Sequence, residues 1–115
     1  MKVIVKKSHK SDVLFPFKAI KGEILQCEER PTQWEGWLYC KNREGFNGWT
    51  PKTFLSQIEN NPGTYQLIRS YNAIEISANE GDSVELKESE SGWAWVINKN
   101  GEEGWIPLEN LNLDT

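Results

Sequence analysis

The residues best suited to recognise a ligand are tryptophans that stand beside glycine and proline. Gly36-Trp37 has a counterpart in Gly92-Trp93, and Gly48-Trp49-Thr50-Pro51 has a counterpart in Gly104-Trp105-Ile106-Pro107. An indole ring offers a large, rigid apolar surface with a single polar N–H group. This chemistry favours the binding of another molecule through an aromatic surface.

The polar residues do not form a recognisable catalytic or metal-binding pattern. Carboxylates are plentiful, but none accompanies a nucleophile, and no glycine-rich phosphate loop occurs. The only histidine, His9, lies in a polar segment and has no partner at a metal-ligand spacing. We therefore expect a protein that is not an enzyme and that uses no cofactor or metal.

The charge of the chain argues against nucleic acids and membranes as partners. The 115 residues include 13 basic and 17 acidic ones, which gives a formal net charge of −4, whereas phosphate binding needs clustered Lys and Arg. The one basic cluster, at residues 2–10, is more simply a solvated terminal face. No apolar run approaches the roughly 20 residues that cross a bilayer, and the start does not resemble a secretory signal. These features favour a cytoplasmic protein.

The tryptophan motifs belong to an internal repeat. The equivalent Trp and Pro residues of the two copies are 56 residues apart, whereas Gly22-Glu23 and Gly81-Asp82 are 59 residues apart. The first copy therefore carries three extra residues, which fall in the polar segment 28–35. Surface loops tolerate such insertions, so this segment is predicted to be a loop.

Each copy carries the signals of short strands. Ser83-Val84-Glu85-Leu86 alternates polar and apolar residues, as a half-buried strand does. The run Trp93-Ala94-Trp95-Val96-Ile97 is aromatic and β-branched, and Asn98-Lys99-Asn100-Gly101 supplies a hairpin turn. The sequence therefore predicts an all-β protein.

The repeat also predicts the domain organisation. The stretch Asn60-Asn61-Pro62-Gly63 is rich in turn residues and lies between the two copies. We expect a first domain at residues 1–56, a linker at 57–64 and a second domain at 65–115.

The two cysteines are too few for a disulfide framework. Cys27 and Cys40 occupy positions filled by Leu86 and Val96 in the second copy. Adjacent strands could bring them close, but we expect small buried hydrophobic residues rather than a disulfide or a metal pair.

The ordered motifs resemble the Src homology 3 domain. In the second copy, Glu75-Ile76-Ser77 leads to a Gly-Asp pair, an apolar strand, an acidic loop, Gly92-Trp93, a hairpin and Gly104-Trp105-Ile106-Pro107. The second copy matches this order from Leu67 to Leu111, and the first copy matches it less well at its start. The resemblance implies two five-stranded barrels in tandem, of a variant, bacterial type.

The resemblance also implies a shallow aromatic groove on each barrel that holds an extended, proline-rich peptide. Alternation along a strand independently places Trp49 and Pro51 on one face, opposite Thr50. Phe54 of the first copy is replaced by Asn110 in the second, so the second groove is incomplete. The implied groove residues are Trp37, Trp49, Pro51 and Phe54 in the first copy, and Trp93, Trp105, Pro107 and Tyr71 in the second.

Two loop residues of the first copy join these candidates. Asp12 lies in the first loop and is a candidate partner for a basic group of a ligand. Trp34 lies in the inserted loop, where its ring must either cover its own barrel or await a partner. The acidic loop residues around both grooves are either simply solvated or steer a basic ligand toward the aromatic surface.

Three functions are compatible with these features. The leading hypothesis is a non-catalytic module that binds another protein as an extended peptide, including a proline-rich or basic one. The alternative is a structural or regulatory pair of barrels whose grooves are closed against each other or against a partner subunit. Cell-wall or glycan binding is a third possibility.

Overall fold

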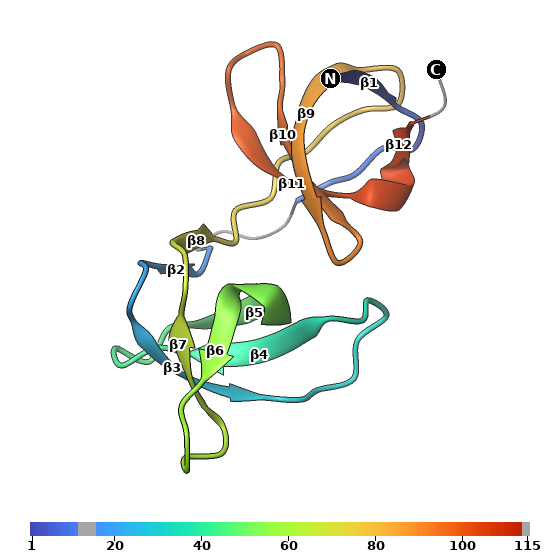
Figure 1. The fold of residues 1–115 in the computed structure, drawn as a ribbon. Coiled ribbons are helices and arrows are strands. Elements are labelled where there is room, and N and C mark those ends of the chain that lie inside the picture. Colours follow the sequence, from blue (N-terminus) through green and yellow to red (C-terminus); the bar gives the residue numbers. More distant parts are fainter. Residues whose placement is uncertain (12–15, 114–115) are drawn as a thin grey trace. The chain divides into compact units, whose positions relative to one another are not determined.

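The chain folds into two compact β units, and one of them is built from two separate stretches of sequence. The computed structural model describes residues 1–11 and 16–113. Unit 1 comprises Met1–Phe15 and Ile74–Thr115, and unit 2 comprises Pro16–Ala73. Unit 2 is therefore inserted, as one continuous stretch, between the two parts of unit 1 (Figure 1).

The regular secondary structure of the described residues consists of short strands and two single-turn 3-10 helices (η1 and η2). The elements in chain order are β1 (Lys2–Val5), β2 (Lys18–Ala19), β3 (Ile24–Glu28), β4 (Trp37–Lys41), β5 (Asn47–Pro51), η1 (Lys52–Phe54), β6 (Leu55–Gln57), β7 (Thr64–Leu67), β8 (Tyr71–Asn72), β9 (Ser83–Glu90), β10 (Trp93–Ile97), β11 (Glu103–Pro107), η2 (Leu108–Asn110) and β12 (Leu111–Asn112). The all-β prediction is confirmed. None of the helices in the described part of the chain is long and apolar enough to cross a membrane.

Unit 2 consists of a five-stranded sheet in the order β5-β4-β3-β7-β6 and a two-stranded sheet of β2 and β8. All of its strand pairs are antiparallel. Burial alternates along β3, where Leu25 and Cys27 point inward between exposed neighbours. This period-2 pattern is that of a strand with one face on the core.

Unit 1 contains a five-stranded sheet in the order β11-β10-β9-β1-β12. Strand β1 lies between β9 and β12, with Val3 opposite Val84 and Val5 opposite Leu111. These side chains belong to one buried core together with Ile106. Figure 1 shows β1, from the start of the chain, beside β9 from its second half.

β1 and β7 fill the same structural role in the two units. β7 lies between β3 and β6 in unit 2, as β1 lies between β9 and β12 in unit 1. The backbone contacts match as well: Gly22 N–H donates to the Leu67 carbonyl, and Gly81 N–H donates to the Val5 carbonyl, both at 2.7 Å. Each unit therefore takes this strand from the other half of the sequence.

This arrangement differs from the predicted division at residues 1–56, 57–64 and 65–115. β6 and β7 pair from Leu55 opposite Leu67 to Gln57 opposite Tyr65, so the predicted linker is a hairpin turn inside unit 2. The repeat identifies which strands are equivalent. It does not determine which copy of the first strand joins which sheet, because both copies offer a short strand of similar polarity.

Cys27 and Cys40 are buried, as expected, but they form a disulfide, which corrects the prediction of two separate side chains. The two residues lie directly opposite each other on β3 and β4. The equivalent pair in unit 1, Leu86 and Val96, also faces across two neighbouring strands. The cross-strand position therefore brings the two sulfur atoms together, and the disulfide joins the strands on either side of the loop at residues 29–36.

The insertion predicts which fragments fold. Residues 16–73 contain every strand of unit 2 and should unfold cooperatively as an isolated fragment. Residues 74–115 lack both β1 and the equivalent strand β7, so β9 and β12 have no strand to pair with between them and this fragment should not fold. Thermal unfolding followed by circular dichroism tests both fragments, and cooperative unfolding of 74–115 alone would contradict the topology.

The disulfide predicts a redox effect on unit 2. Reduction by dithiothreitol should lower its free energy of unfolding by about 2–4 kcal/mol, because the open chain gains conformational freedom when unfolded. Chemical denaturation with and without the reductant measures this effect. The double variant Cys27→Ser/Cys40→Ser is the control and should show no response to the reductant; two titratable thiols in the untreated protein would contradict the crosslink.

Candidate functional site

The outer face of β4 and β5 carries the aromatic residues of unit 2. Trp37 is opposite Pro51, and Tyr39 is opposite Trp49. Thr50 lies between Trp49 and Pro51 on β5 and is fully buried. Trp49 and Pro51 are two residues apart on β5, so the alternation of a strand puts them on the same face.

Side-chain contacts fix the orientation of these rings. The Tyr39 and Trp49 rings meet edge to face, with centroids 5.3 Å apart. The Tyr39 hydroxyl donates to Asn47 Oδ1 at 2.8 Å. The guanidinium of Arg30 lies over the Tyr39 ring, 3.9 Å from its centroid, which is the geometry of a cation–π contact.

Tyr71 lies in unit 2, although the sequence assigns it to the second groove. Tyr71 follows β7 in the chain. Because β7 joins the sheet of unit 2 and β1 joins that of unit 1, Tyr71 lies with the residues of the first copy. Its hydroxyl donates to the Trp49 carbonyl at 2.8 Å, and its ring meets Phe54 edge to face at 5.6 Å. Tyr71 therefore packs on Phe54 and is tied to the backbone of β5 at Trp49.

Most of the predicted groove residues of unit 2 are covered. Trp37 is 8% exposed, Phe54 3% and Tyr71 6%, and Pro51 is fully buried. Tyr39 on β4 and Trp49 on β5 are half-buried, and so is Trp34 in the inserted loop. Asp12 lies outside the described residues.

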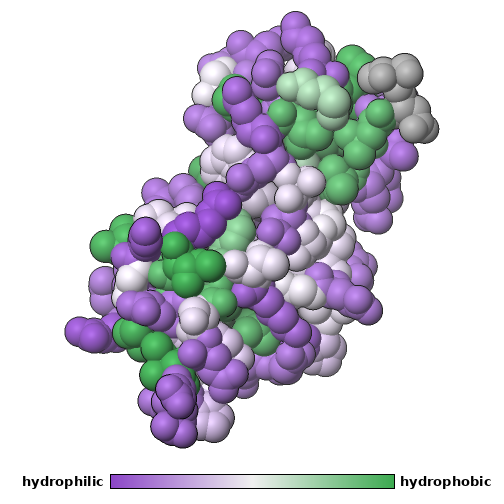
Figure 2. All heavy atoms as spheres, in the orientation of Figure 1, coloured by the Kyte–Doolittle hydropathy of each residue, from purple (hydrophilic) through white to green (hydrophobic). Residues whose placement is uncertain are grey.

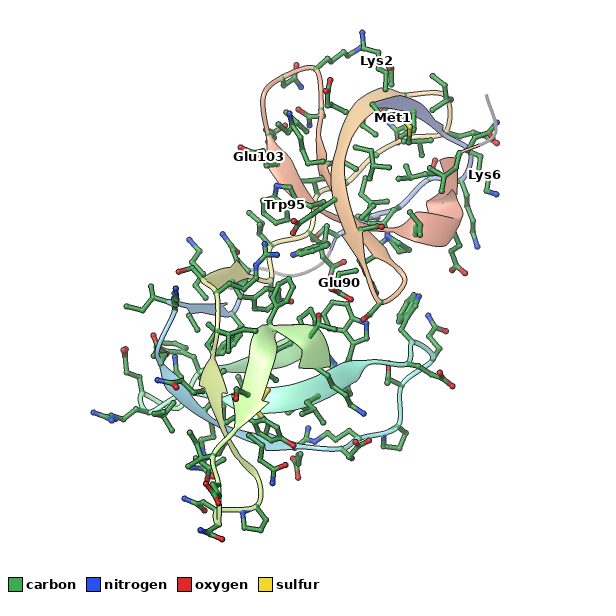
Figure 3. All side chains as sticks on the ribbon, in the orientation of Figure 1. Met1, Lys2, Lys6, Glu90, Trp95 and Glu103 are labelled. Carbon is green, nitrogen blue, oxygen red and sulfur yellow. A yellow bond between two sulfur atoms is a disulfide. The ribbon has the colours of Figure 1, made fainter. Side chains whose placement is uncertain are left out.

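Unit 1 repeats the outer face with different polar contacts. Trp93 is opposite Pro107, and Trp95 is opposite Trp105, with the last two rings 5.3 Å apart. Trp95 Nε1–H donates to Glu103 at 3.0 Å, and the two side chains lie side by side in Figure 3. Trp105 is 4% exposed and Pro107 is buried, whereas Trp93 and Trp95 are half-buried.

His9 and Glu75 complete this surface, and sequence analysis did not select either as a site residue. His9 Nε2 lies 2.9 Å from Glu75 Oε1, and the imidazole meets the Trp93 ring edge to face at 5.9 Å. His9 pairs with Ala78 as Tyr71 pairs with Ala19. His9 is therefore the unit 1 equivalent of Tyr71. The sequence signal for this equivalence is the 62-residue spacing between His9 and Tyr71. It can be interpreted only when β1 is known to occupy in unit 1 the place that β7 occupies in unit 2.

A second aromatic position of unit 2 is also polar in unit 1. Asn110 replaces Phe54 and is 4% exposed, with its side-chain amide donating to the Ser8 carbonyl at 3.3 Å. This confined amide offers no flat ring surface. The surface around Trp93 therefore depends on charged and polar neighbours where unit 2 has aromatic ones.

The two units also differ in charge. Unit 1 has eleven acidic and six basic residues in its sequence, a formal net charge of −5, whereas unit 2 has six acidic and seven basic residues, a net charge of +1. Glu90 is the cross-strand partner of Trp93 on β9. The acidic character of the chain is thus concentrated in the unit that carries Glu75.

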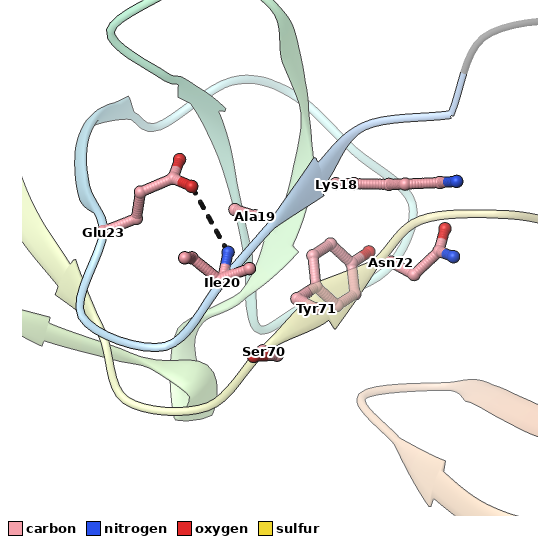
Figure 4. Close-up of a pocket in the computed structure, with 7 residues that line it drawn as sticks. All are labelled: Lys18, Ala19, Ile20, Glu23, Ser70, Tyr71 and Asn72. Carbon is pink, nitrogen blue, oxygen red and sulfur yellow. Dashed lines mark hydrogen bonds between the residues drawn. The ribbon is translucent and has the colours of Figure 1, made fainter.

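Unit 2 has a shallow hollow of about 360 Å³ beside β2 and β8 (Figure 4). Its lining is Lys18, Ala19, Ile20, Glu23, Ser70, Tyr71 and Asn72. Glu23 accepts the backbone N–H of Ile20 at 3.3 Å, so this carboxylate is tied to the turn that carries it. Other exposed apolar residues include Phe46 and Ile4. Figure 2 shows the hydrophobic residues of the visible face in separate patches among hydrophilic ones.

Comparison with known proteins identifies one domain family in the chain. Residues 64–114 match the family described as Variant SH3 domain, and domains of this family are in general non-catalytic binding modules. The match begins at β7 and ends after β12, so it follows the sequence repeat and spans parts of both units. No solved structure matches the chain.

Burial predicts different roles for the two aromatic positions of β4 and β5. Trp37→Ala should destabilise unit 2 by about 3–5 kcal/mol, because it removes a large, mostly buried side chain. Trp49→Ala should cost less, about 1–2 kcal/mol, because half-buried side chains lose less apolar contact. Urea denaturation of the two variants measures the difference; equal costs would contradict the greater burial of Trp37 relative to Trp49.

Proposed function

We propose that the chain is a non-catalytic module that binds an extended segment of another protein along the outer aromatic faces of its units. The accessible part of these faces is Tyr39 and Trp49 in unit 2 and Trp93 and Trp95 in unit 1. The observation that carries this proposal is that an edge-to-face aromatic pair recurs in both units, as Tyr39–Trp49 and Trp95–Trp105. In each pair the first ring is half-buried and is held by a polar contact at its tip.

The ligand of unit 1 is a basic segment in this proposal. The Glu75 side chain is 24% exposed and lies next to the imidazole that contacts Trp93. A cationic side chain over an indole ring gains a cation–π contact, and a carboxylate nearby adds a charge-assisted hydrogen bond. The net charge of −5 on unit 1 supports the same partner by attracting basic segments.

Unit 2 is a second domain of the same type in this proposal, and the protein is a tandem pair. Its β3, β4, β5 and β6 correspond to the strands of unit 1 in order, and β7 supplies the strand that β1 supplies there. The broader interpretations of the sequence, a bacterial type, a cytoplasmic location and a partner that is neither nucleic acid nor membrane, belong to the same proposal.

A second function is favoured by the burial of the groove residues. Trp37, Pro51, Phe54 and Tyr71 in unit 2 and Trp105 in unit 1 are largely covered, and the guanidinium of Arg69 lies over Phe54, 4.1 Å from the ring centroid. A structural or regulatory pair of barrels with closed grooves would have this pattern. It predicts that no peptide reaches the indole rings of either unit.

A peptide titration separates the two functions. The probe is a proline-rich decapeptide that contains one arginine, added to the ¹⁵N-labelled full chain. Shifts of the Trp93 and Trp95 indole N–H signals are expected in nuclear magnetic resonance spectra, and Glu75→Gln should weaken binding about twofold to fivefold, as expected for loss of one partly exposed ion pair.

The control variant is Glu102→Gln, which removes an exposed carboxylate in the hairpin between β10 and β11. It should bind the peptide as the parent protein does. Absence of any indole shift with the peptide, or an equal effect of the two variants, would contradict the proposed function.

A further inference from the structure

The carboxylate of Glu75 is already engaged in the unliganded protein. His9 Nε2 lies 2.9 Å from Glu75 Oε1, and the two side chains are only 17% and 24% exposed. A carboxylate ion can only accept a hydrogen bond, so Nε2 carries the proton in this contact. A basic ligand that approaches Glu75 therefore meets an internal donor at the same oxygen atom.

The backbone holds His9 in this position. Its N–H donates to the Ala78 carbonyl at 2.9 Å, and its carbonyl accepts the Ala78 N–H at 2.8 Å. The imidazole edge also contacts Trp93, at an interplanar angle of 84°. His9 is therefore fixed next to both groups that a cationic side chain would use, the carboxylate and the indole.

We propose that His9 is a specificity-determining residue of unit 1, which competes internally for Glu75 and thereby selects arginine over lysine in the bound segment. This inference rests on the proposed function. An arginine guanidinium forms two parallel hydrogen bonds with a carboxylate, and its planar group also stacks on an aromatic ring. A lysine ammonium is a compact, strongly hydrated charge. Its replacement of the imidazole N–H at Glu75 therefore adds little binding free energy.

The competition is confined to unit 1. The His9 position is filled by Tyr71 in unit 2, whose hydroxyl donates to the Trp49 carbonyl. The residue of the first copy that is equivalent to Glu75, 59 residues earlier in the sequence, is Pro16. Unit 2 therefore has neither the acid nor the competing donor, although its outer aromatic face is equivalent.

The test uses the full chain and two proline-rich decapeptides that differ only in one arginine or lysine. Binding is measured from the Trp93 indole N–H signal at neutral pH. The parent protein should prefer the arginine peptide. His9→Phe keeps a ring beside Trp93 but has no donor, so it should bind the lysine peptide about twofold to fivefold more tightly, which is the expected effect of freeing one partly exposed ion pair.

A second variant separates competition from loss of the imidazole itself. His9→Gln keeps one side-chain N–H donor and should retain the preference for arginine, whereas His9→Phe should narrow it. Thermal unfolding of both variants verifies that unit 1 is intact.

Each outcome of this experiment decides the inference. An unchanged or weaker affinity of a folded His9→Phe protein for the lysine peptide would overturn it, and so would an equal gain in His9→Gln. If binding at Trp93 depends on Glu75 but not on His9, only this inference fails. If neither peptide shifts the Trp93 signal in the parent or the variants, the proposed function fails with it.

Discussion

The pairing of β1 with β9 and β12 joins the two distant parts of unit 1, and the candidate site depends on it. Val3 and Val5 are 2% and 0% exposed, and complete burial of a valine side chain contributes about 1.5–3 kcal/mol. The same pairing continues into the segment that carries His9, whose backbone bonds to Ala78. A unit without β1 would lose part of its core and also the residue that contacts Glu75 and Trp93.

The insertion of unit 2 is compatible with this constraint because its ends lie close together. The Ala73 N–H donates to the Phe17 carbonyl at 2.8 Å, near the pairing of β2 with β8. A folded insert whose ends meet adds little loop-closure cost to the surrounding unit, since that cost grows with the number of flexible residues in the loop. The β6–β7 hairpin and the Cys27–Cys40 disulfide lie entirely within the insert, so they stabilise unit 2 itself.

Local patterns predicted much of the structure. The alternation in Ser83-Val84-Glu85-Leu86, the turn at Asn98-Lys99-Asn100-Gly101 and the shared face of Trp49 and Pro51 all follow from residues close in sequence. The origin of the first strand, the neighbours of Tyr71 and the His9–Glu75 contact depend on pairing between distant segments. Two cysteines in the whole chain do not predict a disulfide by composition, whereas the opposing positions of Cys27 and Cys40 on neighbouring strands bring the two sulfur atoms together. A disulfide is more typical of an oxidising compartment than of the cytoplasm, so the location stays a prediction.

The most direct test of the proposed topology is to determine which strand pairs with β1. Cross-strand nuclear Overhauser effects between backbone protons distinguish the two possible pairings in the intact chain. The strand exchange predicts effects between Val3 and Val84 and between Leu25 and Tyr65, which are register partners here. Effects between Val3 and Leu25 together with Tyr65 and Val84 would show two sequential barrels and contradict the account.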